Sequence, residues 1–365
     1  MKIALITVHN TNSYGANLQA YATYKTLVNL NYDVEMIDYV SPYDPGQKGY
    51  AGMSNTSFLK RTYTKIKNAI LRKNCNDKKA FSNFHKIYRL STAKECYYDV
   101  AVSGSDQLWN PDIFEQIDEN YFLENVNASK YISYAASCGS HVFTADEKEV
   151  LKRLLKKYSF VSVREHFLGK QLKDIVDMPI KLVCDPTFLF SKNQWLEFAN
   201  VSNKKMSSKY ILLYLVGIPY KEYKAKYYKV VKHISEYTNL PVCGISPYSF
   251  ISPKGCKKRL VGYTPHDFVK AIDEAELVIT SSFHGVAFSI NMNKQFVVLS
   301  NSNPARINQL LETYCIKDRI VSSYNEKECE RIINETIAYD DINKKIDSIR
   351  VESLDWLKNS LTNDE

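Results

Sequence analysis

Short apolar runs alternate with helical patterns along most of this chain, and this alternation restricts the fold more than any other feature. Runs typical of buried strands occupy 3–8, 34–37, 100–103, 131–135, 161–163 and 182–184. Apolar residues at helical spacing lie between them, at 17–30 and after the capping box Thr144-x-x-Glu147. Strands that alternate with helices favour parallel sheets buried on both faces, so we expect an α/β fold.

The alternation stops once, between Asp185 and Ser208, and then resumes. The second set of predicted strands occupies 211–216, 242–245, 277–279 and 296–299. At about 100–200 residues per domain, a chain of 365 residues also predicts two domains. We therefore expect two Rossmann-like domains with parallel sheets, at 1–195 and 205–340, and a ligand cleft between them. A C-terminal helix at 341–365 is expected to pack back on the body.

The eight cysteines give neither a metal-ligand spacing nor a disulfide framework, because no two are closer than thirteen positions. The first ten residues lack the apolar run and the small-residue cleavage site of a signal peptide. No uncharged apolar stretch reaches the ~18–20 residues that a membrane span needs. We expect a reduced, cytoplasmic protein with no metal site.

The positive charge is concentrated in one segment. The chain has 48 Lys+Arg and 40 Asp+Glu, a net charge of +8, and the segment from Lys60 to Lys94 holds eleven of the basic residues but one acid. We expect a basic helical insertion at about 55–95, with an amphipathic helix at 59–73. Such a helix is either a solvated face or a contact with an anionic membrane. Nothing in it resembles a nucleic-acid motif, so no nucleic-acid partner is expected.

Polar loops follow the predicted strands. The loop after the first strand contains Asn12, Tyr14, Gly15 and Asn17 but neither a Walker motif nor a G-x-G-x-x-G fingerprint. Because a helix begins in this loop, its free backbone N–H groups could bind an anion. An ordinary polar turn between a strand and a helix would have the same sequence. In Gly104-Ser105-Asp106, the glycine permits close backbone approach, and Asp106 is a base, a hydroxyl ligand or a helix cap.

Two further loops carry groups with sharper chemistry. Arg164, just past a strand, suits bidentate binding of a carboxylate or phosphate, or an ion pair with the adjacent helix. Ser282-Phe283-His284-Gly285 follows the strand at 277–279. A histidine at a strand end beside hydroxyls is placed for proton transfer, although many single histidines are structural. Because carboxyl ends of parallel strands meet at one edge, we expect these loops to converge on the cleft.

Taken in order, these stretches resemble the polysaccharide pyruvyl transferase family. The matching segments are 12–20, 104–110, 131–137, 162–165, 185–187 and 282–289. The resemblance implies a two-domain fold like that of GT-B glycosyltransferases, with the acceptor on the N-terminal side and the donor on the C-terminal side. It implies phosphoenolpyruvate as co-substrate with no other cofactor, and a pyruvate ketal as product in surface polysaccharide biosynthesis, such as exopolysaccharide or capsule. The acceptor would be a sugar or a lipid-linked oligosaccharide, which gives the helix at 59–73 a reason to contact the membrane.

The resemblance also suggests roles for the residues. His284 and Asp106 are the candidate catalytic residues, with His284 as general acid/base. Phosphoenolpyruvate binding is expected from Arg164, Ser282, Gly285 and Arg306, and acceptor or anion binding from Asn12, Tyr14, Gly15, Asn17, Gly104 and Ser105. Many members of the family have Arg-x-His where this chain has Ser282-Phe283-His284, so an anion-binding arginine is missing, and Arg306 is the candidate replacement.

Two other functions fit the same sequence. One is a glycosyltransferase of the same fold that uses a nucleotide-sugar, for which Glu274 or Glu276 would contact the ribose. The other is a glycan-binding relative that has kept the fold and lost the chemistry, which the change at Ser282 makes worth considering.

Overall fold

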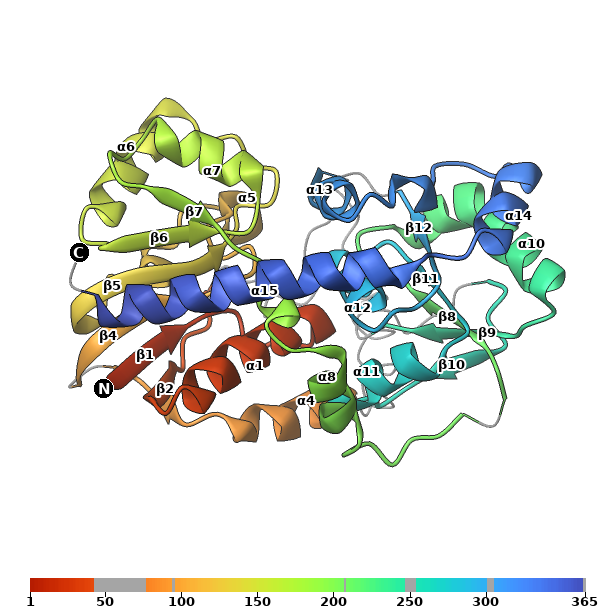
Figure 1. Cartoon of the computed structure of the whole chain (residues 1–365), viewed down its shortest axis with the longest axis horizontal. Coiled ribbons are helices and arrows are strands. Elements are labelled where there is room, and N and C mark those ends of the chain that lie inside the picture. Colours follow the sequence, from red (N-terminus) through yellow and green to blue (C-terminus); the bar gives the residue numbers. More distant parts are fainter. Residues whose placement is uncertain (43–76, 94–95, 207, 247–253, 301–304, 364–365) are drawn as a thin grey trace, which may run out of the picture.

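A computed structural model describes residues 1–42, 77–93, 96–206, 208–246, 254–300 and 305–363. Two α/β units lie side by side, and one long helix, α15 (Tyr339–Thr362), runs across both (Figure 1). The basic helix expected at 59–73 lies outside the described residues. The end of the expected insertion belongs to the fold itself, because Leu90–Ser91 forms an edge strand of the first sheet.

The first sheet has seven parallel strands in the order β3-β2-β1-β4-β5-β6-β7. They are β1 (Lys2–Ile6), β2 (Asp33–Ile37), β3 (Leu90–Ser91), β4 (Tyr97–Ser103), β5 (Asn127–Ala136), β6 (Phe160–Val163) and β7 (Ile180–Leu182). The helices of this part are α1 (Tyr14–Asn29), α4 (Asp77–Phe84), α5 (Pro111–Phe114), α6 (Ala145–Leu155), α7 (His166–Lys173) and α8 (Lys192–Ala199). The capping box expected at Thr144 and Glu147 is present and opens α6.

The second sheet has six parallel strands in the order β10-β9-β8-β11-β12-β13. They are β8 (Ile211–Tyr214), β9 (Val242–Ile245), β10 (Lys258–Leu260), β11 (Leu277–Thr280), β12 (Phe296–Leu299) and β13 (Ile320–Val321). The helices are α9 (Tyr220–Glu222), α10 (Tyr228–Thr238), α11 (Pro265–Glu274), α12 (Phe283–Asn291), α13 (Ala305–Thr313) and α14 (Glu326–Asn334). A short π-helix, η4 (Tyr223–Tyr227), joins α9 to α10.

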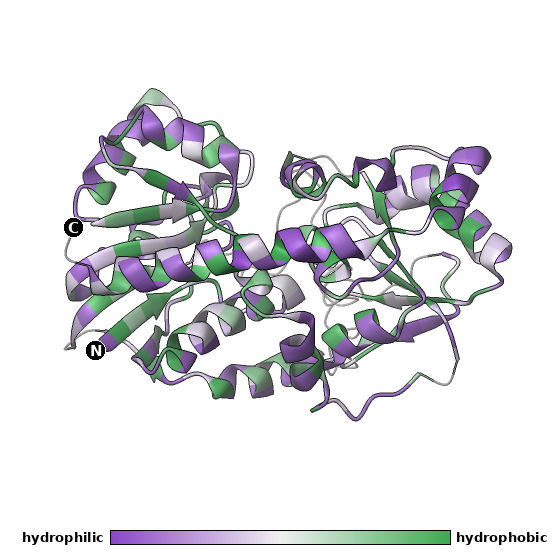
Figure 2. Cartoon of the chain, viewed as in Figure 1, coloured by the Kyte–Doolittle hydropathy of each residue, from purple (hydrophilic) through white to green (hydrophobic). Residues whose placement is uncertain are grey.

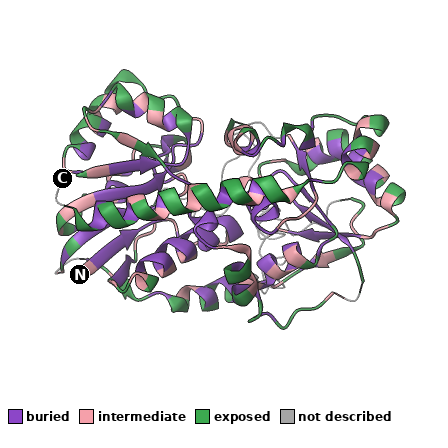
Figure 3. Ribbon diagram, viewed as in Figure 1, coloured by how far each residue is buried: buried purple, intermediate pink, exposed green. Residues whose placement is uncertain are grey.

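The central strands are apolar and closed off from solvent on both faces. Every residue of β8, β9, β11 and β12 is buried. Figure 2 shows the hydrophobic residues gathered in the strands, and Figure 3 shows the same strands buried beneath helices with exposed outer faces. This is why the strands appear in the sequence as continuous apolar runs. Within the described residues, no helix is both long and apolar enough to cross a membrane.

The first turn of α1 joins the two units. The ring of Tyr14 stacks on Phe268 of α11, with centroids 4.6 Å apart, and its hydroxyl donates to the Tyr263 carbonyl oxygen at 3.0 Å. Along the chain's last helix, Arg350 of α15 donates through Nε to the Phe188 carbonyl oxygen at 2.6 Å. The Ser353 hydroxyl of α15 accepts from the Cys184 amide at 3.0 Å. Elements from both ends of the chain therefore hold the junction.

We predict that Tyr14 contributes to stability through this packing. Tyr14→Ala should lower the free energy of unfolding by about 3–5 kcal/mol, because it removes a buried ring. Tyr14→Phe keeps the ring and loses one hydrogen bond, so it should lower that free energy by only about 0.5–1.5 kcal/mol. Urea denaturation followed by tryptophan fluorescence measures both. An unfolding free energy of Tyr14→Ala equal to that of the unchanged protein would contradict the prediction.

Candidate active site

Arg164 is the centre of a buried charge cluster at the junction of the two units. It follows β6, and its side chain is 2% exposed. Its Nη1 is 2.6 Å from Asp185 Oδ2, its Nε is 3.0 Å from Glu165 Oε1, and its Nη2 is 3.6 Å from Asp106 Oδ1. Burial by itself lowers the pKa of Arg164, but the three carboxylates outweigh it and the pKa lies above its usual value. Arg164 is therefore a fixed positive charge.

Asp185 connects this arginine to the second unit. Its Oδ2 lies 2.6 Å from Arg164 and 3.7 Å from Nε2 of His284. Its Oδ1 accepts from the Thr187 amide at 2.9 Å and from the Thr187 hydroxyl at 2.7 Å. Burial raises the pKa of Asp185, but Arg164 first and then His284 and Thr187 lower it, and the net shift is downward. The carboxylate is ionised although it is buried.

His284 lies in the first turn of α12, where Ser282 is the N-cap. Burial lowers the pKa of His284, which Asp185 and Asp106 only partly offset, so the neutral imidazole is favoured. Its Nε2 is buried and has no hydrogen-bond partner among the described residues. The ring packs against Gly15 of α1, where an ideal Cβ would overlap Nδ1 and Cγ of His284. A glycine is thus required at the point where α1 meets the histidine.

Arg306 approaches the same place from α13. Its guanidinium carbon lies 5.4 Å from the centroid of the Phe283 ring, and that of Arg164 lies 4.9 Å from it. Within the described ranges, the buried Nε of Arg306 has no hydrogen-bond partner. Burial lowers the pKa of Arg306, and the neighbouring charge of Arg164 lowers it further. Two arginines from different units therefore meet at one aromatic ring.

Gln309, one turn further along α13, holds this helix against the first unit. Its Nε2 donates to the Arg164 carbonyl oxygen at 3.1 Å, and its Oε1 accepts from the His166 amide at 2.9 Å. Residues three apart on a helix share a face, so these bonds also orient Arg306.

The loop after β4 contacts Arg164 through Ser105. The Ser105 hydroxyl accepts from Arg164 Nη1 at 3.3 Å and donates to the Ala135 carbonyl oxygen at 2.8 Å. Asp106 has a φ of +75°, in the left-handed region that aspartate tolerates better than most residues. At Gly104 a Cβ would come within 2.8 Å of Thr7 Cβ, so the glycine allows the close approach of two strands.

The remaining predicted residues have structural partners. Asn17 donates to the carbonyl oxygens of Thr11 and Ser13, both at 2.7 Å, and its Oδ1 lies 2.7 Å from His85 Nε2. The Ser282 hydroxyl accepts from the Gly285 amide at 3.4 Å. At Gly285 a Cβ would overlap Thr280 Oγ1. Tyr14 is enclosed between the units as described above, and Asn12 is half-buried in the loop before α1.

Of the predicted residues, the structure brings together Arg164, Ser105, Asp106, Gly15, His284 and Arg306. Six charged or titratable side chains meet at this place, and we call them the junction cluster: Asp106, Arg164, Glu165, Asp185, His284 and Arg306. The sequence analysis assigned no role to two of these six, Asp185 and Glu165. Asp185 directly follows the apolar run at 182–184, so the strand-end rule used for the other loops would have found it. The catalytic and binding roles assigned to all of the predicted site residues stay predictions, whether or not the residues lie together.

Glu165 differs from the other carboxylates of the junction cluster. Burial raises its pKa, and Arg164 and Arg306 do not fully reverse the shift. Its Oε1 accepts from the Ser137 hydroxyl at 2.7 Å, whereas its Oε2 is buried with no hydrogen-bond partner among the described residues. Glu165 therefore takes up a proton more readily than an exposed glutamate does.

Comparison with known proteins decides the family. A family model described as "Polysaccharide pyruvyl transferase" matches residues 14–303. The chain belongs to the polysaccharide pyruvyl transferase family. The match contains all of the junction cluster except Arg306, which follows it by three residues. No curated protein sequence matches the chain.

Solved structures show the fold. A putative UDP-N-acetylglucosamine 2-epimerase from Listeria monocytogenes superposes with a TM-score of 0.51 at 9% identity, over 96% of this chain and 90% of that one. A UDP-GlcNAc 2-epimerase from Neisseria meningitidis, bound to UDP-GlcNAc, gives a TM-score of 0.50 at 8% identity, over 99% of both chains. The expected GT-B-like arrangement of two Rossmann-like units is confirmed.

We predict that Gly15→Ala disrupts the site. The new methyl group would occupy the space of the His284 ring, so it should lower the free energy of unfolding by about 1–3 kcal/mol through overpacking. Gly169→Ala is the matched control, because a Cβ there meets nothing closer than 3.5 Å and alanine favours the helix. Urea denaturation compares the two. Equal stability of both variants would show that Gly15 and His284 are not in contact.

We also predict that His284 makes the protein sensitive to acid. Its pKa is lower in the folded protein than the value of about 6.5 in the unfolded chain. The stability associated with the neutral ring is therefore complete above about pH 6.5 and is lost as the pH falls toward the folded pKa. His284→Gln should lose less stability than the unchanged protein between about pH 7 and pH 5. Denaturation midpoints that fall in parallel for both proteins would contradict this.

Proposed function

We propose that this protein is a pyruvyl transferase that moves the enolpyruvyl group of phosphoenolpyruvate onto two hydroxyls of a sugar, forming a pyruvate ketal in surface polysaccharide biosynthesis. The observation that carries the proposal is the meeting of Arg164, Arg306 and His284 at the unit junction of a polysaccharide pyruvyl transferase family member.

Recognition of the donor rests on hydrogen-bonding atoms that the protein leaves unpaired. Three buried atoms have no hydrogen-bond partner among the residues that the structure describes: Nη2 of Arg164, Nε of Arg306 and Nε2 of His284. A buried polar group without a partner costs about 1–3 kcal/mol, and a carboxylate or phosphate that pairs with it would remove that cost. Phosphoenolpyruvate carries both anionic groups, so it suits a site with two guanidinium groups.

Arg306 has the larger part in attracting the anion. Three carboxylates lie within ion-pair distance of Arg164 and offset its charge, whereas Arg306 of α13 forms no such ion pair with any of the described residues. Ser282 supplies a helix cap where many members of the family have arginine. In this proposal Arg306 replaces that missing charge.

The reaction proceeds by addition and then substitution at C2. One sugar hydroxyl attacks C2 while a proton is added to C3. The C2–C3 double bond becomes a single bond, and the methylene carbon C3 becomes a methyl group. The C2–O bond to phosphate then breaks, and the second hydroxyl attacks C2 to close the ketal ring. The two hydroxyls release two protons, of which one balances the proton added to C3 and the other is taken up with inorganic phosphate.

His284 is the general acid/base in this scheme. It is favoured as neutral before the donor binds, and the negative charge of phosphoenolpyruvate would raise its pKa so that it takes up a proton. Asp185, 3.7 Å from Nε2, stabilises the imidazolium form. Asp106, 3.6 Å from Arg164, is the candidate base for the attacking hydroxyl. Proton transfer of this kind contributes about 10²–10⁴-fold to a rate.

The acceptor in this proposal approaches from the first unit. A pocket of about 660 Å³ there is lined mostly by acidic and amide side chains, such as Asp118, Asn120 and Glu147, together with Tyr39 and a few apolar residues. Carboxylates, amides and an aromatic ring suit sugar hydroxyls and the apolar face of a sugar. If the sugar is carried on a lipid, the basic segment 59–73 is the part of the chain expected to contact the membrane surface.

The test is turnover with phosphoenolpyruvate and a pool of glycan acceptors, followed by phosphate release and by the mass of the product. We expect His284→Gln to lower kcat by about 10²–10⁴-fold. Arg306→Gln should raise the KM for phosphoenolpyruvate by about 10–100-fold, as for loss of a charge-assisted hydrogen bond. Arg153→Gln, on an exposed pair in α6, is the matched control and should change neither constant.

Two outcomes would overturn the proposal. Release of a nucleoside diphosphate from a sugar nucleotide, with no phosphate from phosphoenolpyruvate, would identify a glycosyltransferase. Glycan binding without turnover of either donor would identify a non-catalytic relative.

A further inference from the structure

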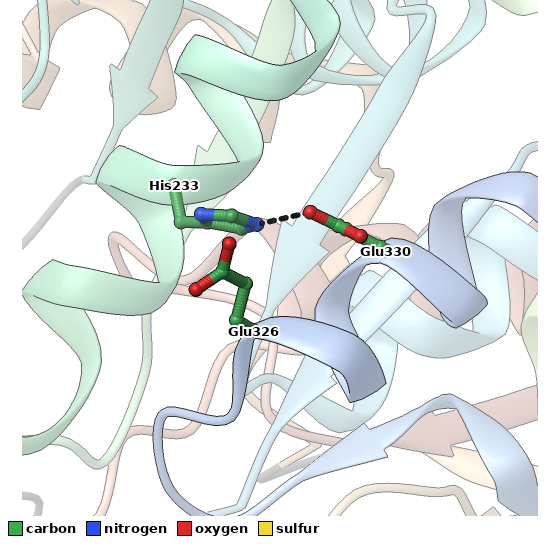
Figure 4. Close-up of side chains that lie close together, drawn as sticks. All are labelled: His233, Glu326 and Glu330. Carbon is green, nitrogen blue, oxygen red and sulfur yellow. Dashed lines mark ion pairs between the residues drawn. The ribbon is translucent and has the colours of Figure 1, made fainter.

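A second group of titratable side chains lies at the far end of the C-terminal unit, away from the junction cluster. His233 belongs to α10, and Glu326 and Glu330 belong to α14, which packs beside it (Figure 1). Figure 4 shows both carboxylates directed toward the imidazole ring. One ligand atom from each of the three residues lies within 4.8 Å of the other two.

The histidine nitrogen at this place is poorly satisfied. His233 Nε2 is buried and has no hydrogen-bond partner in the part of the chain that the structure describes, and its separation from Glu330 Oε1 is 3.5 Å. That distance is long for a charge-assisted hydrogen bond, which is typically about 2.7–2.9 Å. The three groups therefore surround a point that none of them fills, which is the arrangement expected of ligands around a small cation.

The donor set has the chemistry of a first-row transition-metal site. Neutral imidazole and carboxylate oxygens both bind Zn²⁺, with metal–ligand distances of about 2.0–2.2 Å. A tetrahedral metal at those distances places its ligand atoms about 3.4 Å apart, so the present group must contract slightly. Glu326 is exposed and Glu330 is half-buried, so rotation of these two side chains can supply the contraction.

The surroundings orient the imidazole for this role. Glu326 and Glu330 are four residues apart and so share one face of α14. The Tyr324 hydroxyl lies 3.5 Å from Nδ1 of His233, which leaves Nε2 to face the carboxylates. The ring is also held between Tyr237, stacked at 6.1 Å, and Tyr324, edge-on at 5.8 Å. A partner at the second nitrogen is the usual accompaniment of a metal-bound histidine.

We propose that His233, Glu326 and Glu330 bind a divalent first-row transition metal, Zn²⁺ in the first instance, with water in the remaining position. The metal fastens α10 to α14 on the outer face of the second sheet. This site is independent of the proposed transferase chemistry, because none of its residues belongs to the junction cluster.

No metal site is expected from the sequence, because these ligands are not at close spacing. His233 lies 93 positions before Glu326, and only the packing of α10 against α14 brings the two together. Only the pair Glu326 and Glu330 lies close in sequence, and a pair of glutamates on a helix is common on protein surfaces.

The test is thermal unfolding of the full chain, first treated with a chelator and then given ZnCl₂, CoCl₂ or MnCl₂. At metal concentrations about 100 times Kd, we expect a rise in Tm of about 5 °C. Bound Co²⁺ should in addition give the visible absorption of a four-coordinate site. Equilibrium dialysis should find one Zn²⁺ per chain.

Variants separate metal binding from simple electrostatics. His233→Gln and Glu330→Gln should each abolish the Tm rise and the Co²⁺ absorption. Glu328→Gln removes the same charge from α14 at a position outside the group of three, and should keep both signals. The proposal is overturned if no metal changes the Tm of the unchanged protein, or if His233→Gln responds as the unchanged protein does. The three side chains would then form an ion-pair network only.

Discussion

The ion pair between Arg164 and Asp185 is the interaction on which the rest of the site depends. Both side chains are 2% exposed, so each ion has lost nearly all its water, a penalty of several kcal/mol that only close pairing can offset. The pairing follows from the sheet, because β6 and β7 are adjacent parallel strands with Val163 opposite Leu182. The residues just past these strands emerge at the same edge, and the charges meet there.

With Asp185 held by Arg164, contacts around it fix the position of the second unit relative to the first. His284 lies 3.7 Å from Asp185 and packs on Gly15, while Gln309 of α13 bonds to the backbone on either side of Glu165. Each contact joins a residue of the first unit to a helix of the second, α12 or α13. A shift of either unit would therefore move His284 and Arg306 together, away from Arg164 and its carboxylates.

The sequence was sufficient for the architecture, and for a physical reason. Strands such as Leu277–Thr280 are buried on both faces, so each is a continuous apolar run that is visible without knowledge of its neighbours. The strand-end rule likewise found Arg164, Asp106 and His284. The rule does not say where a side chain points, so it also selects Tyr14 and Asn17. In the structure Tyr14 contacts the second unit, and the Asn17 side chain donates to the loop just before α1. Contacts between distant helices, such as His233 with Glu330, leave no local pattern at all.

The proposed role of Arg306 concerns the charge that the site lacks at Ser282. Ser282 caps α12 with a hydroxyl, which is the role that short polar side chains fulfil best at a helix start. An arginine at 282 would give up that cap in exchange for a cation. In the proposed function the cation comes from α13 instead, because Arg306 lies at the same aromatic ring as Arg164, 5.4 Å from the centroid. Gln309 bonds α13 to the backbone at Arg164, so the position of Arg306 is fixed relative to that of Arg164. On this proposal, binding of the anion depends on where the positive charge lies and not on which element of the chain supplies it.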